Sequence, residues 1–444
     1  MCDNRHYISE VPLSLNSVRK RVEAFLSSNG LRLAALERYV VISRDEDGDE
    51  IIAGGGLDGN VIKCVAVSEA ARSEGLMNIL VSRLIAIAHE EGHDSVKAFT
   101  KPANKDIFKS LGFELIASSN NAILMENGRG GLPEYRKYLE SLARPGRNGA
   151  IVMNANPFTK GHRYLIEQAA SQVDNLYVIV VKEERSRFPY VERKAMIEAG
   201  CAGLDNVIVC EGSDYAVSAA TFPTYFLKQL DDATPTHIAL DLDLFVKHIA
   251  RPLGVTVRFA GSEPEDNLTH CYNEMMSEIL PAGGYNATSQ ENGIKFVEIP
   301  RLEQNGRPVS ATSLRSALDR GDLKAAMEFV PVSTVPYLIA ELAERSLRLE
   351  LDTTPKPGLV DKQDTGSHKD MDYALMSASI SALRPKKTKI AVGAVAGVNA
   401  AEIMSIGIDA ETSMLRATGG VNTHKGALFC IGLSVAAASF LACG

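Results

Sequence analysis

Apolar side chains recur with two different periods in the first part of the chain, which indicates helices and strands in turn. Leu76, Leu80 and Leu84 follow helical spacing and place apolar groups on one face of a predicted helix. Short runs rich in β-branched residues predict strands on either side, with a hairpin turn at Asp47-Gly48. We therefore expect an α/β fold for residues 1–127.

From Ala150 onward, short β-branched runs alternate with helical patterns, which is typical of a parallel sheet covered by helices. The predicted strands cover residues 150–154, 176–181, 206–210, 237–242, 255–261 and 295–300. A segment rich in Gly, Arg and Pro at 126–149 separates this region from the first domain. The pattern predicts a doubly wound, Rossmann-like domain over residues 148–337.

The strand pattern ends near Leu338, and residues 338–444 have the character of an all-α unit. Its last stretch, 427–444, is apolar and long enough to be considered as a membrane span. This stretch is rich in Ala, Gly and Ser and has no flanking aromatic residues, which favours a buried helix of an all-α domain. We therefore expect no membrane partner.

The overall charge of the chain narrows its functional class. The net charge of −8 argues against nucleic-acid binding through a basic surface, because phosphate neutralisation dominates such binding. Seven cysteines without a Cys-x-x-Cys pair support neither a zinc ribbon nor a thioredoxin-like site. With no signal peptide at the N-terminus, we expect a reduced, cytoplasmic protein.

The first candidate site follows the predicted strand 150–154, where Asn156-Pro157-Phe158-Thr159-Lys160-Gly161-His162 opens a helix. Open α/β sheets bind ligands at the carboxyl ends of their strands, and the free N–H groups of a helix N-terminus attract phosphate. Gly161 allows a ligand to come close to the backbone. Thr159 and His162 are three residues apart, so both are expected to face the same phosphates, with the imidazole donating as negative charge develops.

The second candidate site follows the predicted strand 295–300. Hydroxyl groups at Ser310, Thr312 and Ser313 are placed to cap the next helix, and Arg315 offers a planar set of donors one turn further on. We expect the two donor-rich loops to meet across one sheet.

The two motifs together resemble the cytidylyltransferase-like nucleotidyltransferase superfamily, whose first motif reads [HT]-x-G-H, as in 159–162 here. The second motif of that superfamily, I-S-[ST]-[ST]-x-[IV]-R, is matched well but not perfectly by 309–315. The chain is also similar to citrate lyase ligase over about residues 1–340. The stretches that carry this likeness are 150–169, 182–200, 211–228, 251–276 and 300–318.

The resemblance to citrate lyase ligase implies a reaction. Members of that family activate acetate with ATP as acetyl-adenylate, release pyrophosphate, and acetylate the thiol of the phosphoribosyl-dephospho-CoA arm on the acyl carrier (gamma) subunit of citrate lyase. By this resemblance, His162 and Thr159 bind the α- and β-phosphates, while Arg315 with Ser310 and Thr312 binds the leaving pyrophosphate. Mg²⁺ is expected with the polyphosphate rather than on protein ligands.

Four further residues complete the expected nucleotide site. By the resemblance, Asn156, Gly161 and Ser313 are binding residues. Arg193 is a candidate for a phosphate or nucleotide contact, although a solvated arginine on a helix face is an open alternative.

The first domain contains Arg72-Ser73-Glu74-Gly75-Leu76-Met77, which resembles the pyrophosphate loop of GNAT acetyltransferases, [QR]-x-x-G-x-[GA]. Met77 replaces the final small residue and places a side chain where backbone N–H groups approach phosphate. The segment 108–113 matches the late helix-to-strand segment of the same family. The resemblance implies a GNAT-like fold, either as an acetyltransferase or as a domain that presents the carrier arm.

The last unit contains two motifs, 354–372 and 419–427, that resemble triphosphoribosyl-dephospho-CoA synthase. That family uses ATP and dephospho-CoA to make the precursor of the citrate lyase prosthetic group. Lysine, histidine and carboxylates on these loops suit triphosphate and metal binding, and capped helix ends are the alternative. The match covers about the first 100 residues of that family, so we expect a truncated unit with an exposed apolar helix and no synthase activity.

Two alternatives to the ligase reading stay open. The first is a simple adenylyltransferase that acts on a pantetheine- or nucleotide-like phosphate. The second is a non-catalytic scaffold for the carrier protein of citrate lyase. Dependence of pyrophosphate release on acetate or on a phosphate acceptor separates the enzymatic readings, and the intact pairs Thr159/His162 and Ser310/Arg315 argue against the scaffold.

Overall fold

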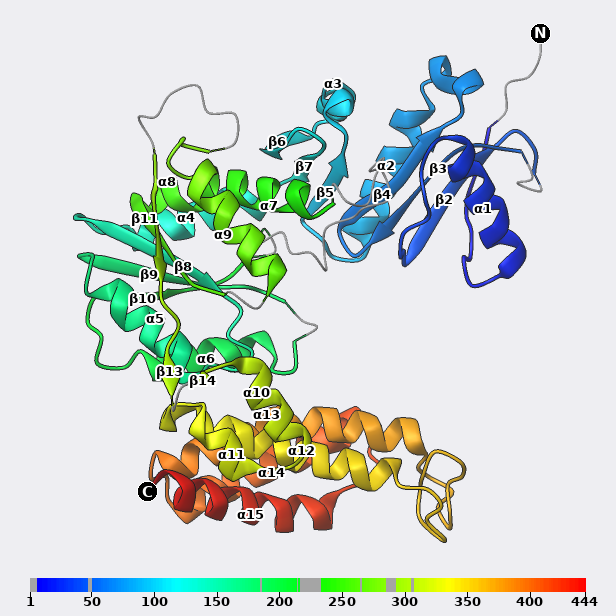
Figure 1. Cartoon of the computed structure of the whole chain (residues 1–444). Coiled ribbons are helices and arrows are strands. Elements are labelled where there is room, and N and C mark those ends of the chain that lie inside the picture. The colour runs from blue at the N-terminus through cyan, green and yellow to red at the C-terminus, as the bar shows by residue number, and fades with distance from the viewer. Residues whose placement is uncertain are drawn as a thin grey trace. The chain divides into compact units, whose positions relative to one another are not determined.

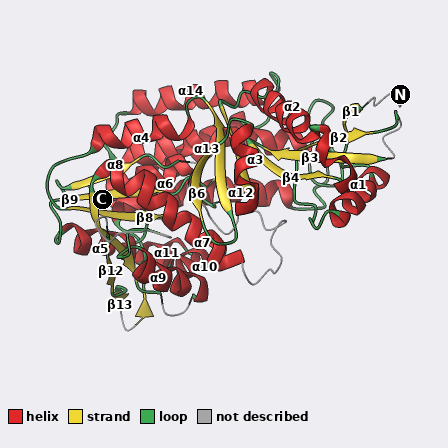
Figure 2. Ribbon diagram, turned by 90° about the horizontal axis from the view of Figure 1, so that it is seen from above, coloured by secondary structure: helices red, strands yellow, loops and turns green. Residues whose placement is uncertain are grey.

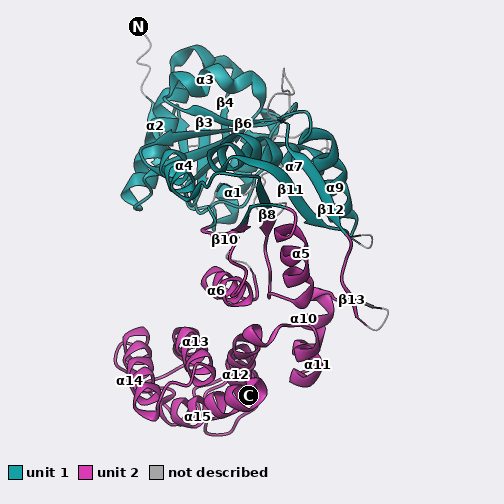
Figure 3. Ribbon diagram, turned by 90° about the vertical axis from the view of Figure 1, so that its left-hand side faces the viewer, with its two compact units in different colours: residues 1–151, 173–177, 212–299 teal, residues 152–172, 178–211, 300–444 magenta. Residues whose placement is uncertain are grey.

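A computed structural model describes residues 6–46, 50–183, 186–213, 215, 233–263, 266–284, 293–304 and 307–444. The chain forms two compact units (Figure 3). The first contains residues 1–151, 173–177 and 212–299, and the second contains residues 152–172, 178–211 and 300–444. The turn predicted at Asp47-Gly48 and most of the ligase-like stretch 211–228 lie outside the described residues.

The N-terminal domain is built on a seven-stranded sheet with the order β1-β2-β3-β4-β5-β7-β6 (Figures 1 and 2). Its strands are β1 (Tyr7–Glu10), β2 (Arg38–Ser43), β3 (Ile51–Asp58), β4 (Val61–Val67), β5 (Ser95–Thr100), β6 (Glu114–Ser118) and β7 (Ile123–Gly128). Its helices are α1 (Asn16–Ser28), η1 (Glu69–Glu74), α2 (Leu76–Glu90), η2 (Pro102–Asn104), α3 (Lys105–Ser110) and α4 (Gly131–Leu142). The predicted mixed α/β character of this region is confirmed.

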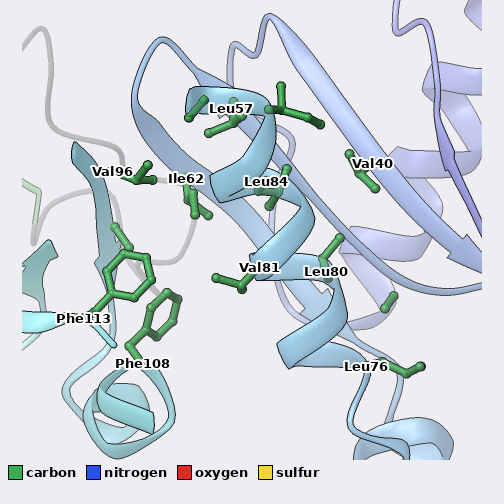
Figure 4. Close-up of a cluster of buried hydrophobic side chains, with 14 of the residues drawn as sticks. Val40, Leu57, Ile62, Leu76, Leu80, Val81, Leu84, Val96, Phe108 and Phe113 are labelled. Atoms are coloured by element: carbon green, nitrogen blue, oxygen red, sulfur yellow. The ribbon is translucent and has the colours of Figure 1, made fainter. Parts of the chain in front are cut away.

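The core of this domain lies between α2 and the sheet. Leu76, Leu80 and Leu84 are almost fully buried, as their helical spacing predicts. Figure 4 shows these side chains facing apolar residues of the strands, among them Leu57 and Ile62. Burial of a leucine of this kind contributes about 1.5–3 kcal/mol.

The central sheet has five strands in the order β10-β9-β8-β11-β12, and β11 runs parallel to both β8 and β12. Its strands are β8 (Asn148–Met153), β9 (Asn175–Val180), β10 (Val207–Cys210), β11 (Val255–Gly261) and β12 (Lys295–Ile299), with a separate ribbon of β13 (Glu303–Gln304) and β14 (Arg307–Pro308). The helices are α5 (Lys160–Ala170), α6 (Tyr190–Gly200), α7 (Ala233–Leu244), α8 (Arg251–Leu253), α9 (Asn267–Ile279), α10 (Ala311–Asp319) and α11 (Leu323–Glu328). The strand order reverses between β8 and β11, and such a switch point is where doubly wound sheets bind ligands.

The predicted strand 237–242 is wrong, because these residues belong to helix α7. Buried residues surround most of that helix, so its sequence shows no amphipathic period and reads as a short apolar run. The chain then continues through one π-helical segment, Phe245–Ala250, into α8. Periodicity alone cannot show whether a short apolar run is a strand or a buried helix. Residues 237–242 are helical as part of a longer helical segment that continues to Leu253.

The C-terminal region is helical, as predicted. It contains η5 (Val332–Thr334), α12 (Val335–Asp352), α13 (Tyr373–Val395), α14 (Ala400–Ala417) and α15 (Lys425–Cys443). Helix α13 passes through Pro385, although a proline inside a helix removes one backbone hydrogen bond.

Helix α15 is long and apolar enough, by length and composition, to cross a membrane, with a mean hydropathy of 2.1. It contacts α13 and α14 through apolar side chains near its start, including Ala427 and Leu428. Only 17% of its apolar stretch is buried, and Phe429, Phe440 and Leu441 are exposed. The expectation of a buried core helix is therefore wrong for most of its surface, while the expected exposure of an apolar face is confirmed.

Candidate nucleotide-binding site

The loop after β8 is folded tightly before α5 begins. Ala155 adopts a positive φ of 46°, which is uncommon for a residue with a side chain. Phe158 is fully buried and lies against Gly200, where an added Cβ would come within 2.3 Å of the phenyl ring. These contacts fix the direction in which the chain enters α5.

Thr159 caps α5 in a reciprocal arrangement with His162. The Thr159 hydroxyl oxygen accepts from the backbone N–H of His162 at 3.3 Å, and the Thr159 N–H donates to the imidazole Nδ1 at 3.0 Å. Thr159 is only 2% exposed. The structure therefore gives its hydroxyl a role in positioning His162, and does not place it as the expected direct phosphate ligand.

The hydrogen bonds also determine the tautomer of His162. A backbone N–H can only donate, so Nδ1 must be the acceptor and the proton of the neutral ring lies on Nε2. Burial, followed by the positive charges of Arg301 and Arg315, lowers the pKa of His162 from 6.5 to about 4. The side chain is thus a neutral Nε2–H donor near pH 7, which suits a phosphate oxygen.

Gly161 brings the two predicted loops together. A Cβ at this position would lie 3.2 Å from the carbonyl oxygen of Val309, just before the second motif. Lys160 links the first loop to the end of α11, because its N–H donates to the carbonyl of Phe329 at 2.9 Å and its Nζ to that of Glu328 at 2.8 Å. Gly161 therefore serves a close approach between backbones within the protein.

The second loop begins α10 with Ser310 as its cap, as predicted. The Ser310 hydroxyl accepts from the Ser313 N–H at 3.1 Å. Arg315 donates to the carbonyl of Asn156 at 2.9 Å and to the Thr312 hydroxyl at 3.1 Å. One guanidinium thus joins the two motifs, and its charge is close enough to affect His162.

Comparison with known proteins gives this geometry a family. Residues 148–338 match the citrate lyase ligase C-terminal domain. A citrate (pro-3S)-lyase ligase from Klebsiella pneumoniae is 41% identical over 328 residues, which cover 73% of this chain and 94% of that protein. The chain belongs to the citrate lyase ligase family. Membership makes it a ligase.

The C-terminal helices of this ligase match a second family. Residues 336–442 match ATP:dephospho-CoA triphosphoribosyl transferase. A probable 2-(5''-triphosphoribosyl)-3'-dephosphocoenzyme-A synthase from Vibrio cholerae is 44% identical over 106 residues, which cover 22% of this chain and 34% of that protein. The chain therefore spans about a third of the length of this synthase relative.

Among solved structures, a putative N-acetyltransferase from Lactobacillus plantarum matches 28% of the ligase chain and 99% of its own chain, with 15% identity and a TM-score of 0.24.

In the N-terminal domain, a cavity of about 640 Å³ has Arg72, Gly75 and Met77 in its lining. It lies where β4 and β5 separate, because these strands pair only at residues 61–62 and 97–98.

Arg193 of the ligase has a different role from the one expected. Its side chain is fully buried and donates to the carbonyls of Phe188, Asn154, Val181 and Glu183. A guanidinium committed to carbonyls at the ends of β8 and β9 shapes the site and is not placed to bind nucleotide. The open alternative of a solvated helix-face side chain is wrong, because no part of Arg193 is exposed.

Two arginines of the ligase were not selected from the sequence. Arg301 follows β12 and lowers the pKa of His162, so it contributes positive charge to the site. Arg187 hydrogen-bonds the carbonyl of Arg315 at 3.4 Å. A basic residue just after a strand of the central sheet is the signal that could have identified Arg301.

The synthase-like motifs form internal contacts in the ligase. Asp361 is buried and accepts from the N–H groups of Gln363 and Asp364, which hold its pKa below the usual value. Asp372 caps α13. His424 contacts the Ser379 hydroxyl through Nδ1 at 2.8 Å. Asp372 thus caps a helix end and His424 links the start of α15 to α13.

Proposed function

We propose that this protein uses ATP, bound as its magnesium complex, to convert acetate to acetyl-adenylate, and then acetylates the thiol of the citrate lyase carrier arm. The observation that carries the proposal is the Arg315 bridge from the second motif to the carbonyl of Asn156 in the first. It supports a single cradle for one triphosphate, built from two donor-rich loops.

The first step is an in-line displacement. A carboxylate oxygen of acetate forms a bond to the α-phosphorus, the bond from that phosphorus to the bridging oxygen breaks, and pyrophosphate leaves with the electron pair. The Nε2–H of neutral His162 donates to phosphate oxygen as charge develops, while the positive charge of Arg315 stabilises the leaving pyrophosphate. Thr159 and Asn156 position these two groups.

In the second step, the sulfur of the carrier thiol attacks the acetyl carbonyl and the carbon–oxygen bond to AMP breaks. The thiol proton passes to water or to the departing phosphate. The product is a thioester on the carrier arm, which is the activated form of citrate lyase in this reading. The name of the 41% identical relative, a citrate (pro-3S)-lyase ligase, supports citrate lyase as the partner.

The decisive assay is acetate-dependent exchange of labelled pyrophosphate into ATP. His162→Ala should lower this rate by roughly a hundredfold to ten-thousandfold, the range for loss of a group that donates in the transition state. Circular dichroism should stay unchanged, because the rest of the domain core does not depend on the ring. An unchanged exchange rate in the variant would remove His162 from the mechanism.

The choice of acceptor tests the reaction class. Incubation with ATP, Mg²⁺, labelled acetate and the thiol form of the carrier protein should place label on the carrier. Pyrophosphate release that needs a phosphate acceptor rather than acetate would favour a simple adenylyltransferase. No turnover with either acceptor would favour a carrier-protein scaffold.

The N-terminal cavity favours a supporting role in this scheme. Its lining includes Arg72, Lys101 and residues of the diverging strands β4 and β5. An extended chain with amides and phosphates fits such a surface, because separated strands present free backbone groups. We therefore propose that this domain presents the carrier arm, and calorimetric titration with acetyl-CoA tests the acetyltransferase alternative.

A further inference from the structure

Arg187 lies in the segment between β9 and α6 and connects this segment to α10 and α12, all within the second unit. Its guanidinium contacts Glu341 of α12 through two nitrogens, at 2.8 and 2.6 Å. A third nitrogen donates to the Asp319 carboxylate at 2.8 Å and lies 3.4 Å from the carbonyl oxygen of Arg315. The side chains of Arg187 and Glu341 are 19% and 9% exposed, so their pair is shielded from water, while the Asp319 side chain is 64% exposed.

The same segment also holds the first motif. The N–H of Phe188 donates to the side-chain oxygen of Asn156 at 3.0 Å. The carbonyl of Asn156 in turn accepts from Arg315. Adjacent residues, Arg187 and Phe188, therefore contact both phosphate-site loops, one at α10 and the other just before α5.

Glu341 comes from the helical region that matches the synthase family. It is two turns into α12 and 8% exposed, and its burial raises the pKa of its carboxyl group, an effect that Arg187 opposes. A buried carboxylate needs such a partner, because an unpaired one carries a large desolvation cost. The contact is thus a buried pair rather than a passing surface contact.

A second bridge ties the same helices to the ligase segment. Arg384 of α13 contacts both carboxylate oxygens of Glu192 in α6, at 3.2 and 2.8 Å, and also contacts Glu344 of α12 at 2.9 Å. Thr388 of α13 adds a hydrogen bond to Glu192 at 2.8 Å. Figure 3 shows α6, α10, α12 and α13 within one unit.

From this arrangement we infer that Arg187 is a positioning residue for the adenylation step, anchored by Glu341 of the synthase-like helices. Its contacts on α10, with the carbonyl of Arg315 and the carboxylate of Asp319, hold the second half of that helix and with it the backbone that carries the guanidinium of Arg315. Release of Arg187 lets α10 shift, and a displacement of about 1 Å at a charge that stabilises the leaving group costs up to about a hundredfold in rate. The inference rests on the role proposed for Arg315.

The test compares Arg187→Ala, Arg187→Lys and Glu341→Gln in the full-length protein by acetate-dependent pyrophosphate exchange. Arg187→Ala and Glu341→Gln should each lower kcat by about tenfold to a hundredfold, with KM for acetate within about twofold. The double variant should lose little more than Arg187→Ala alone, because the two residues act as one unit. Arg187→Lys should be intermediate, since a lysine keeps the charge but cannot bridge three groups.

Arg348→Ala is the matched control. Arg348 pairs with Glu344 at 2.8 Å and with the Ser381 hydroxyl at 2.9 Å, so its contacts stay within α12 and α13. It should lower the melting temperature without changing kcat. Should the Arg187 and Glu341 variants behave like this control, the pairs are merely structural and the inference is overturned.

The outcomes separate this inference from the proposed function. Wild-type exchange that needs acetate and is lost in His162→Ala, together with unchanged kcat in the Arg187 and Glu341 variants, rejects only the positioning role. Absence of acetate-dependent exchange in the wild type rejects both. If Arg187→Ala fails to fold, Glu341→Gln and Arg187→Lys carry the comparison.

Discussion

Two helices of the second unit begin with the same reciprocal cap but with different chemistry. At α5, Thr159 and His162 exchange hydrogen bonds with each other's backbone N–H groups. At α14, Asn399 and Glu402 do the same, with distances of 3.1 and 2.9 Å. The backbone geometry is therefore alike, and only the side chain in the third position carries a different charge.

This difference decides what each helix end is available for. The carboxylate of Glu402 complements the positive end of the helix dipole and adds to stability. His162 satisfies the same N–H while uncharged, because its pKa is lowered to about 4. The positive end of α5 is thus left for an external anion. An uncharged capping side chain can satisfy the N–H groups of a helix end without neutralising its positive dipole.

The sharpest way to break the comparison is to give α5 the chemistry of α14. His162→Glu should lower exchange by about tenfold more than His162→Gln, because a carboxylate at the helix end repels phosphate, while helix stability is kept. The rates of the two variants and their melting temperatures provide the check. Equal rates would mean that the charge at this position is irrelevant.

The reverse substitution is the control for that prediction. Glu402→His at α14 should leave exchange unchanged and lower stability by about 0.3–1 kcal/mol, the usual size of a charge–dipole interaction. A loss of exchange in this variant would show that the α14 cap is not independent of the site.

Removal of the two capping side chains sharpens the comparison further. Thr159→Ala and Asn399→Ala should each cost about 0.5–2 kcal/mol of stability in urea unfolding. Only Thr159→Ala should also slow exchange, by about tenfold, because the Thr159 hydroxyl lies 2.9 Å from Nδ1 of His162 and helps to orient the imidazole. Equal exchange rates in both variants would reduce Thr159 to a cap.

The smallest predicted effect is on the pH dependence of stability. The folded pKa of His162 is lowered from 6.5 to about 4, so the folded state disfavours the protonated ring. Its contribution to stability is complete above pH 6.5 and is lost as the pH falls from there through about 4. Urea unfolding of the wild type and His162→Gln should show a smaller acid loss in the variant. The Glu402 cap gives no histidine contribution of this kind.

Much of the site could be predicted from the sequence because its order along the chain is local. A strand, a tight loop with Gly161 and a capped helix follow one another within a few residues. The Ser310 cap was predicted for the same reason.

What failed depends on contacts that sequence spacing does not contain. Arg193 looks like other helix arginines, yet its burial commits it to four carbonyls from distant segments. Residues 237–242 have strand-like composition, and their helical surroundings override it. Arg187 contacts Glu341, which is 154 positions away, and Arg315 and Asp319 on α10, which are 128 and 132 positions away. Tertiary environment, rather than local preference, assigns the role in each case.

The overlap of the two family matches at residues 336–338 falls in the first turn of α12. The two matched regions therefore meet inside one continuous helix and not at a flexible linker. A chimera that replaces the C-terminal helices of this ligase should therefore keep the carboxylate of Glu341 or supply a substitute for it. Because the two matched regions share α12, they cannot be exchanged as independent domains.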